Sequence, residues 1–154
     1  MNDDRREKGD RPGRPSSLSG SVRAVGLGLI SDIVATLAAS IVLTGVVGRQ
    51  LAGGNASVED IEKTLLASDA YILLALAVGL ASTVLGGYVA ARVAGEREYL
   101  HGLLTGIAVL VFGEIMLAQS PATYPLGYRV IGVLLTVPAA LYGAHLRKRA
   151  RRAA

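Results

Sequence analysis

A run of 24 residues from Ala24 to Val47 carries a single charged side chain, that of Asp32. A helix rises about 1.5 Å per residue, so about 20 apolar residues can cross the hydrocarbon core of a bilayer. The apolar region of a signal peptide is shorter, at about 7 to 15 residues. The sequence therefore predicts a retained membrane-spanning helix over residues 22–47, and the rest of the chain must be compatible with a membrane fold.

Three further apolar segments are long enough to cross a bilayer, at residues 70–94, 101–118 and 128–146. The chain is 51% hydrophobic, which is too apolar for an ordinary soluble domain of 154 residues. We therefore expect an all-α, integral membrane bundle of four helices within residues 21–146.

The two ends of the chain differ in composition from this bundle. Residues 1–20 mix both charge signs with Gly, Pro and Ser, and we expect a disordered tail there. Residues 147–154 form a basic C-terminal tail. Thirteen Lys and Arg residues fall in the terminal regions and near the link between the second and third spans, against three elsewhere. The positive-inside rule then predicts that both termini are cytoplasmic.

The connections also carry local signals. Ser57 followed by Glu59 and Asp60 is typical of a helix N-terminus, and we expect a short amphipathic helix within residues 49–68. The link between the second and third spans is short and starts with Gly95, so these spans should form an antiparallel hairpin. Pro138 should kink the fourth span.

A polar seam runs along the first span, and Asp32 is its only acid. The seam repeats every four residues, at Gly28, Asp32, Thr36, Ser40, Thr44 and Gly48. Such a row cannot face lipid, because unpaired polar groups are costly there. Tyr88 and Arg92 are the expected partners of Asp32. Two interpretations stay open: a proton- or cation-coupled site, or a structural contact between helices.

Other features are more typical of structure than of chemistry. Glu114 is expected to form an ion pair with Arg129 or Lys63 near the outer interface. Small residues that should permit close helix packing are Gly28, Gly79, Gly86, Gly87, Gly102 and Gly106.

Several function classes are disfavoured. There is no Cys, and the two His residues have no ligand cluster around them, so we expect no metal and no cofactor. No nucleophile with a base and no phosphate loop is present, so we expect no enzymatic activity. The basic residues flank apolar runs without interleaved aromatics, which argues against nucleic acid as a partner.

The segment LGGYVAARVAG at residues 85–95, followed by LHGLLTG at residues 100–106, resembles a group of small bacterial membrane proteins with four spans and no known function. The stretch Gly28–Thr36 adds to this resemblance. It implies a bacterial cytoplasmic membrane location, no assigned activity and a shared core of Asp32, Gly86, Gly87, Tyr88 and His101.

The sequence favours a structural or accessory module in the lipid bilayer, acting as a homo-oligomer or with another membrane protein. The alternative is a minimal proton- or cation-coupled transporter or channel that works as an oligomer through Asp32.

Overall fold

The computed structural model describes residues 18–48, 50, 57–119 and 124–153, and it is an all-α bundle. Its helices are α1 (Leu18–Leu43), which continues into the π-helical turn η1 (Thr44–Gly48), then α3 (Val58–Leu66), α4 (Asp69–Ala94), α5 (Glu98–Gln119) and α6 (Leu126–Ala153). Four stretches are long and apolar enough to cross a membrane, the first of them Leu18–Val47 and the others α4, α5 and α6. The expected fold class, a bundle of four membrane helices, is confirmed.

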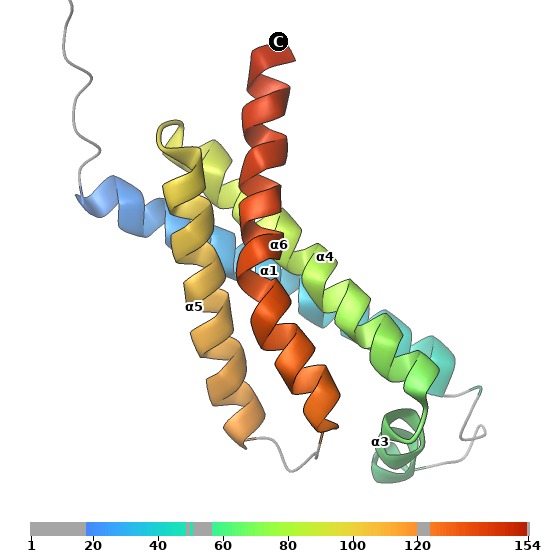
Figure 1. Cartoon of the computed structure of the whole chain (residues 1–154). Helices are drawn as coiled ribbons and strands as arrows, with labels where there is room; N and C mark the ends of the chain where they lie inside the picture. The colour runs from blue at the N-terminus through green and yellow to red at the C-terminus, as the bar shows by residue number, and fades with distance from the viewer. Residues whose placement is uncertain (1–17, 49, 51–56, 120–123, 154) are drawn as a thin grey trace, which may run out of the picture.

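The four long helices form two pairs. α1 packs along α4, α5 packs along α6, and α4 joins the pairs through its contact with α6 (Figure 1). We call the end with the α4–α5 connection the turn end, and the opposite end the α3 end. Toward the α3 end, the α1 and α4 pair separates from the α5 and α6 pair (Figure 1). The bundle is therefore closed at one end and splayed at the other.

Helix boundaries differ from the expected ones at both ends of the bundle. α1 starts at Leu18, so residues 18–20 of the expected tail are helical. α6 runs to Ala153 and includes most of the expected basic tail. Lys, Arg and Ala are good helix formers, which explains this continuation. Residues 1–17 of the expected N-terminal tail lie outside the described residues.

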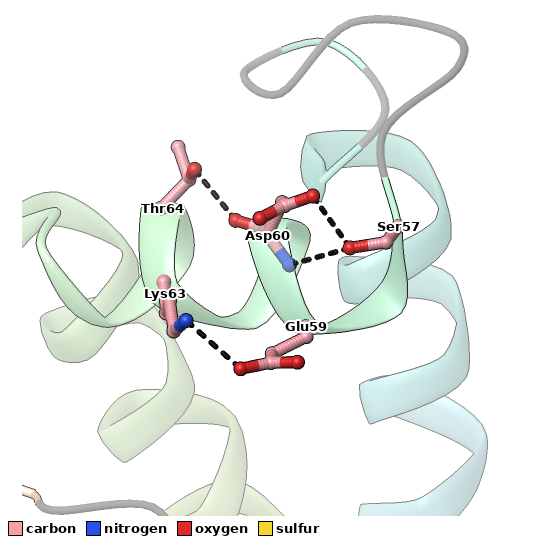
Figure 2. Close-up of polar contacts among 5 residues, drawn as sticks. All are labelled: Ser57, Glu59, Asp60, Lys63 and Thr64. Carbon is pink, nitrogen blue, oxygen red and sulfur yellow. Dashed lines mark hydrogen bonds and ion pairs between the residues drawn. The ribbon is translucent and has the colours of Figure 1, made fainter.

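The short helix α3 has the expected N-terminal cap. The Ser57 hydroxyl accepts a 3.2 Å hydrogen bond from the backbone amide of Asp60 and donates a 2.5 Å hydrogen bond to its carboxylate (Figure 2). Lys63 lies 2.9 Å from Glu59 one turn away, and Leu65 is only 2% exposed. The amphipathic helix between the first two spans is thus confirmed.

The connection from α4 to α5 is a tight turn. Gly95 has a φ of +68°, a left-handed conformation that favours glycine, and its amide donates to the carbonyl of Ala91. Arg97 follows with a φ of +48°. The predicted antiparallel hairpin is therefore present.

α6 continues through Pro138 without ending, and it changes direction partway along its length (Figure 1). Proline removes one intrahelical hydrogen bond and crowds the preceding turn. The bend agrees with the expected kink.

Candidate functional site

The helices are in backbone contact in the half of the bundle nearest the turn end. A Cβ atom added to Gly87 would overlap the carbonyl of Ala140, and one added to Gly143 would overlap the carbonyl of Val84. At Gly28 the added atom would lie 2.8 Å from the carbonyl oxygen of Gly86. Small residues allow this approach in a membrane, where van der Waals packing holds helices together.

A groove opens between the two helix pairs in the other half. Its volume is about 220 Å³, and all four long helices line it. Polar groups in its wall come from Asp32 and Thr36 of α1, Thr83 of α4, Glu114 of α5, and Arg129 and Thr136 of α6. The rest of the lining consists of Tyr128, glycines and aliphatic side chains. The splaying of the helix pairs thus creates a polar groove inside an otherwise apolar bundle.

Asp32 forms the floor of this groove, where the packed half begins. The residue is 7% exposed, and the hydroxyl of Thr83 lies 2.9 Å from its Oδ1. Among the described residues, this is the one hydrogen bond to the carboxylate. A carboxylate accepts several hydrogen bonds when ionised, so the groove side of Asp32 has acceptor capacity to spare.

Thr83 has two acceptors within reach of its single hydroxyl hydrogen. Its Oγ1 lies 2.9 Å from Asp32 Oδ1 and 3.1 Å from the carbonyl oxygen of Gly79. The hydroxyl can donate to Asp32 when that residue is ionised. When Asp32 is protonated, the hydroxyl can accept from it and donate to Gly79 instead. The contact therefore suits both protonation states of the acid.

The mouth of the groove carries the ion pair expected from the sequence. Arg129 Nη2 lies 2.8 Å from Glu114 Oε2, and both side chains are partly exposed. Thr36, one helical turn after Asp32 in the seam of α1, also lines the groove. The two acids therefore mark the floor and the mouth of one groove, a relationship that the sequence interpretation did not anticipate.

The expected pairing of Asp32 with Tyr88 or Arg92 is wrong, because the partner is Thr83. Gly28 faces Gly86 across the antiparallel pair of α1 and α4, so Asp32 faces a position closer to the α3 end than Tyr88. Arg92 is exposed at the turn end. A Cβ atom added to Gly86 would lie 3.0 Å from the Cβ of Asp32, so the depth expected from the sequence was close and the hydrogen-bond partner was wrong.

The glycines divide into two groups. Gly28, Gly86, Gly87, Gly102 and Gly106 all pack closely against neighbouring helices, as expected. The expectation of close packing at Gly79 is wrong, because a Cβ atom there would meet nothing within 4 Å. The residue lines the groove instead. Gly113 is equally open and lines the same groove. In the sequence, small residues at four-residue spacing look the same whether they lie on a packed helix face or in the wall of a groove.

The sequence interpretation missed a buried ionic contact at the turn end. Glu98 is 5% exposed, and its Oε1 lies 3.2 Å from Arg151 Nη1. Arg151 also donates a 2.8 Å hydrogen bond to the carbonyl of Gly95. The sequence interpretation treated residues 147–154 only as a basic tail, and the contact forms because this tail is helical and brings Arg151 back to the turn.

His101 is 1% exposed, so it lies inside the bundle and not at an open interface. Its Nδ1 is 3.2 Å from the carbonyl oxygen of Arg97 in the preceding turn. Within the described residues, no group of three His, Asp or Glu side chains is placed to hold a metal ion. The groove is therefore the site on which we base the functional argument.

Compared with known proteins, the chain matches no family model, no curated protein and no solved structure.

Proposed function

We propose that this chain is a multi-pass protein of the bacterial cytoplasmic membrane with both termini in the cytoplasm. The uneven distribution of Lys and Arg supports this orientation, and the resemblance of residues 85–106 to small bacterial membrane proteins supports the location. In this orientation the turn end faces the cytoplasm and the groove opens toward the outer side.

We further propose that the protein is a minimal proton- or cation-coupled transporter whose binding site is Asp32. The observation that carries this proposal is the asymmetry around that residue. One side of Asp32 borders a polar groove, and on the other side the helices are in backbone contact. This is the arrangement that a transporter needs when its site is accessible from one side of the membrane only.

The chemistry of the groove is suited to a proton or a small cation. A charged carboxylate at this depth is costly unless it is solvated, paired or protonated, and Thr83 supplies a single hydrogen bond. The groove volume of about 220 Å³ is below the range of about 300–1,000 Å³ that is usual for drug-sized ligands. At about 30 Å³ per molecule it has room for several waters. Water in the groove would connect Asp32 to the outer solution.

Reconstituted vesicles test this proposal. Proteoliposomes with a dye sensitive to protons, sodium or potassium inside should show flux under an imposed gradient of the matching ion, compared with empty vesicles. Asp32→Asn should abolish the flux. Asp69→Asn is the matched control, because it removes one exposed carboxylate from the start of α4, outside the groove. Wild-type vesicles that behave like empty ones under all three gradients would overturn the proposal.

The second candidate is the accessory module that the sequence favours. Its supporting observation is that Gly79 and Gly113 have no atom within 4 Å of an added Cβ, so the groove wall leaves room for another helix to approach closely. In this case the tagged protein in mild detergent should co-purify with a membrane partner or a second copy. Asp32→Asn should then leave the assembly size unchanged and no flux should be measured in the wild type.

A further inference from the structure

The basic end of α6 has two faces with different contacts. Arg151 lies on one face and binds Glu98 and the carbonyl of Gly95. The other face repeats at a spacing of three and four residues and consists of His145, Lys148, Arg149 and Arg152. One face therefore holds the helix against the bundle, and the other is free to bind something else.

The free face forms a pocket with α5. His145, Lys148, Arg149 and Arg152 line it together with Tyr99, and its volume is about 300 Å³. No acidic side chain is among these lining residues. The three cationic side chains form no ion pair with the described residues. The pocket thus concentrates positive charge that the rest of the described chain does not neutralise.

Aromatic contacts hold the wall of this pocket in place. The hydroxyl of Tyr99 lies 2.9 Å from His145 Nδ1, and Lys148 Nζ lies 4.7 Å from the centre of the Tyr99 ring. Tyr142 stacks on His145 from one turn earlier, with an angle of 16° between the rings. Two side chains of the pocket are therefore positioned before any ligand arrives.

We propose that this pocket binds the phosphate group of an anionic phospholipid. Arg and Lys side chains are the usual partners of phosphate, and Arg can bind two of its oxygens at once. Tyrosines in this position mark the depth at which lipid head groups lie. Basic pockets between membrane helices on the cytoplasmic side bind such head groups.

A lipid fits better than a soluble phosphate because an apolar surface continues from the pocket into the membrane. Leu103 lies one turn along α5 from Tyr99, on the same face, and its side chain is 36% exposed. An acyl chain can lie along this face while the head group occupies the pocket. A phospholipid therefore fits the depth at which the pocket lies in the membrane. This inference does not depend on transport through Asp32.

A fluorescent reporter at the rim of the pocket tests this inference. The chain has no Trp, so Tyr142→Trp gives a single reporter next to His145. The full chain is reconstituted in phosphatidylcholine nanodiscs that contain a minor fraction of lipid with brominated acyl chains, which quench Trp. Brominated phosphatidylglycerol should quench more strongly than the same fraction of brominated phosphatidylcholine. Equal quenching would overturn the proposal.

Two double variants in the same background separate the pocket from general surface charge. R149Q/R152Q should remove the excess quenching, because both guanidinium groups line the pocket. R23Q/R147Q removes the same amount of charge outside the pocket and should retain the excess quenching by brominated phosphatidylglycerol. Gln has nearly the helix propensity of Arg, so both variants should keep their helix content, measured by circular dichroism. An equal loss in both would contradict a defined site.

Competition identifies the source of the phosphate. Inorganic phosphate or glycerol 3-phosphate added to the solution should leave the excess quenching unchanged, because neither has an acyl chain to lie against α5. Loss of the excess quenching on addition of either compound would show that a soluble phosphate occupies the pocket, and would overturn the assignment to lipid.

Discussion

The hydroxyl of Thr83 on α4 lies 2.9 Å from the carboxylate of Asp32 on α1 and 3.1 Å from the carbonyl of Gly79 in its own helix. A helical Thr commonly contacts the carbonyl four residues earlier, as Thr105 and Thr136 do here. At Thr83 that carbonyl gives the hydroxyl another acceptor when Asp32 gains a proton. The geometry is therefore compatible with both interpretations of Asp32.

Thr83→Val should destabilise the bundle, because valine keeps the shape of threonine and removes the hydroxyl. Hydrogen bonds between membrane helices contribute about 0.6 kcal/mol on average and up to about 1.7 kcal/mol. We expect a loss near the upper value at neutral pH, measured by unfolding in mixed detergent. Thr83→Ser retains the hydroxyl and is the control. If Thr83→Val costs the same in the Asp32→Asn background, the two side chains are not coupled.

Gly87→Ala should destabilise the closed half of the bundle. The added methyl group would overlap the backbone of Ala140, which cannot move away as a flexible side chain can. Overpacking of this kind costs about 1–3 kcal/mol. Gly26→Ala is the control, because nothing lies within 4 Å of a Cβ there, and alanine stabilises a helix interior by about 0.5–1 kcal/mol. Opposite shifts in unfolding temperature are expected, and a shift of the same sign in both variants would contradict this packing.

Glu98→Gln should loosen the attachment of the α6 tail. The carboxylate of Glu98 is almost fully buried, whereas the side chain of Arg151 is 52% exposed. An ion pair with one half-exposed partner contributes about 0.2–1 kcal/mol, so we expect a loss of at most about 1 kcal/mol. Glu96→Gln, in the exposed part of the same turn, should have almost no effect. Proteolysis of the tail by trypsin measures the difference, and equal cleavage rates would contradict it.

The cap of α3 should depend on pH. The hydrogen bond from the Ser57 side chain lowers the pKa of Asp60 below its ordinary value, and burial opposes this shift. A carboxyl whose pKa is lowered in the folded state stabilises that state at neutral pH, and this contribution is lost as the pH falls through the lowered value. The amides of α3 should therefore exchange more slowly than unprotected amides near neutral pH. In acid they should lose this protection. Ser57→Ala should remove most of this dependence.

The spans could be predicted from the sequence because length and hydropathy alone decide whether a helix crosses a bilayer. The helix cap at Ser57 and the turn at Gly95 could also be predicted from the sequence, since each depends on a few adjacent residues. The ends of α1 and α6 could not be predicted. A basic segment has the composition of a tail, and whether it continues a helix depends on a distant partner such as Glu98.

The candidate site was only half predictable. The cost of a lone carboxylate in an apolar helix singled out Asp32, and the charges near the helix ends gave the pair of Glu114 and Arg129. The partner of Asp32 depends on the register between α1 and α4, and a row of small residues permits several registers. Gly79 shows the same limit, because its spacing matches that of packed glycines while its surroundings are open.

The one-sided packing of the bundle has a mechanical consequence. The close backbone approaches between α4 and α6 at Gly87 and Gly143 lie level with Asp32 or nearer the turn end, so those contacts can act as a fulcrum for the two arms beyond them. Each arm extends for about 20 Å at 1.5 Å per residue, and a rotation of about 5° would move its tip by roughly 2 Å. A change of charge at Asp32 would act next to the fulcrum, where a small displacement is converted into the widest opening or closing at the tips.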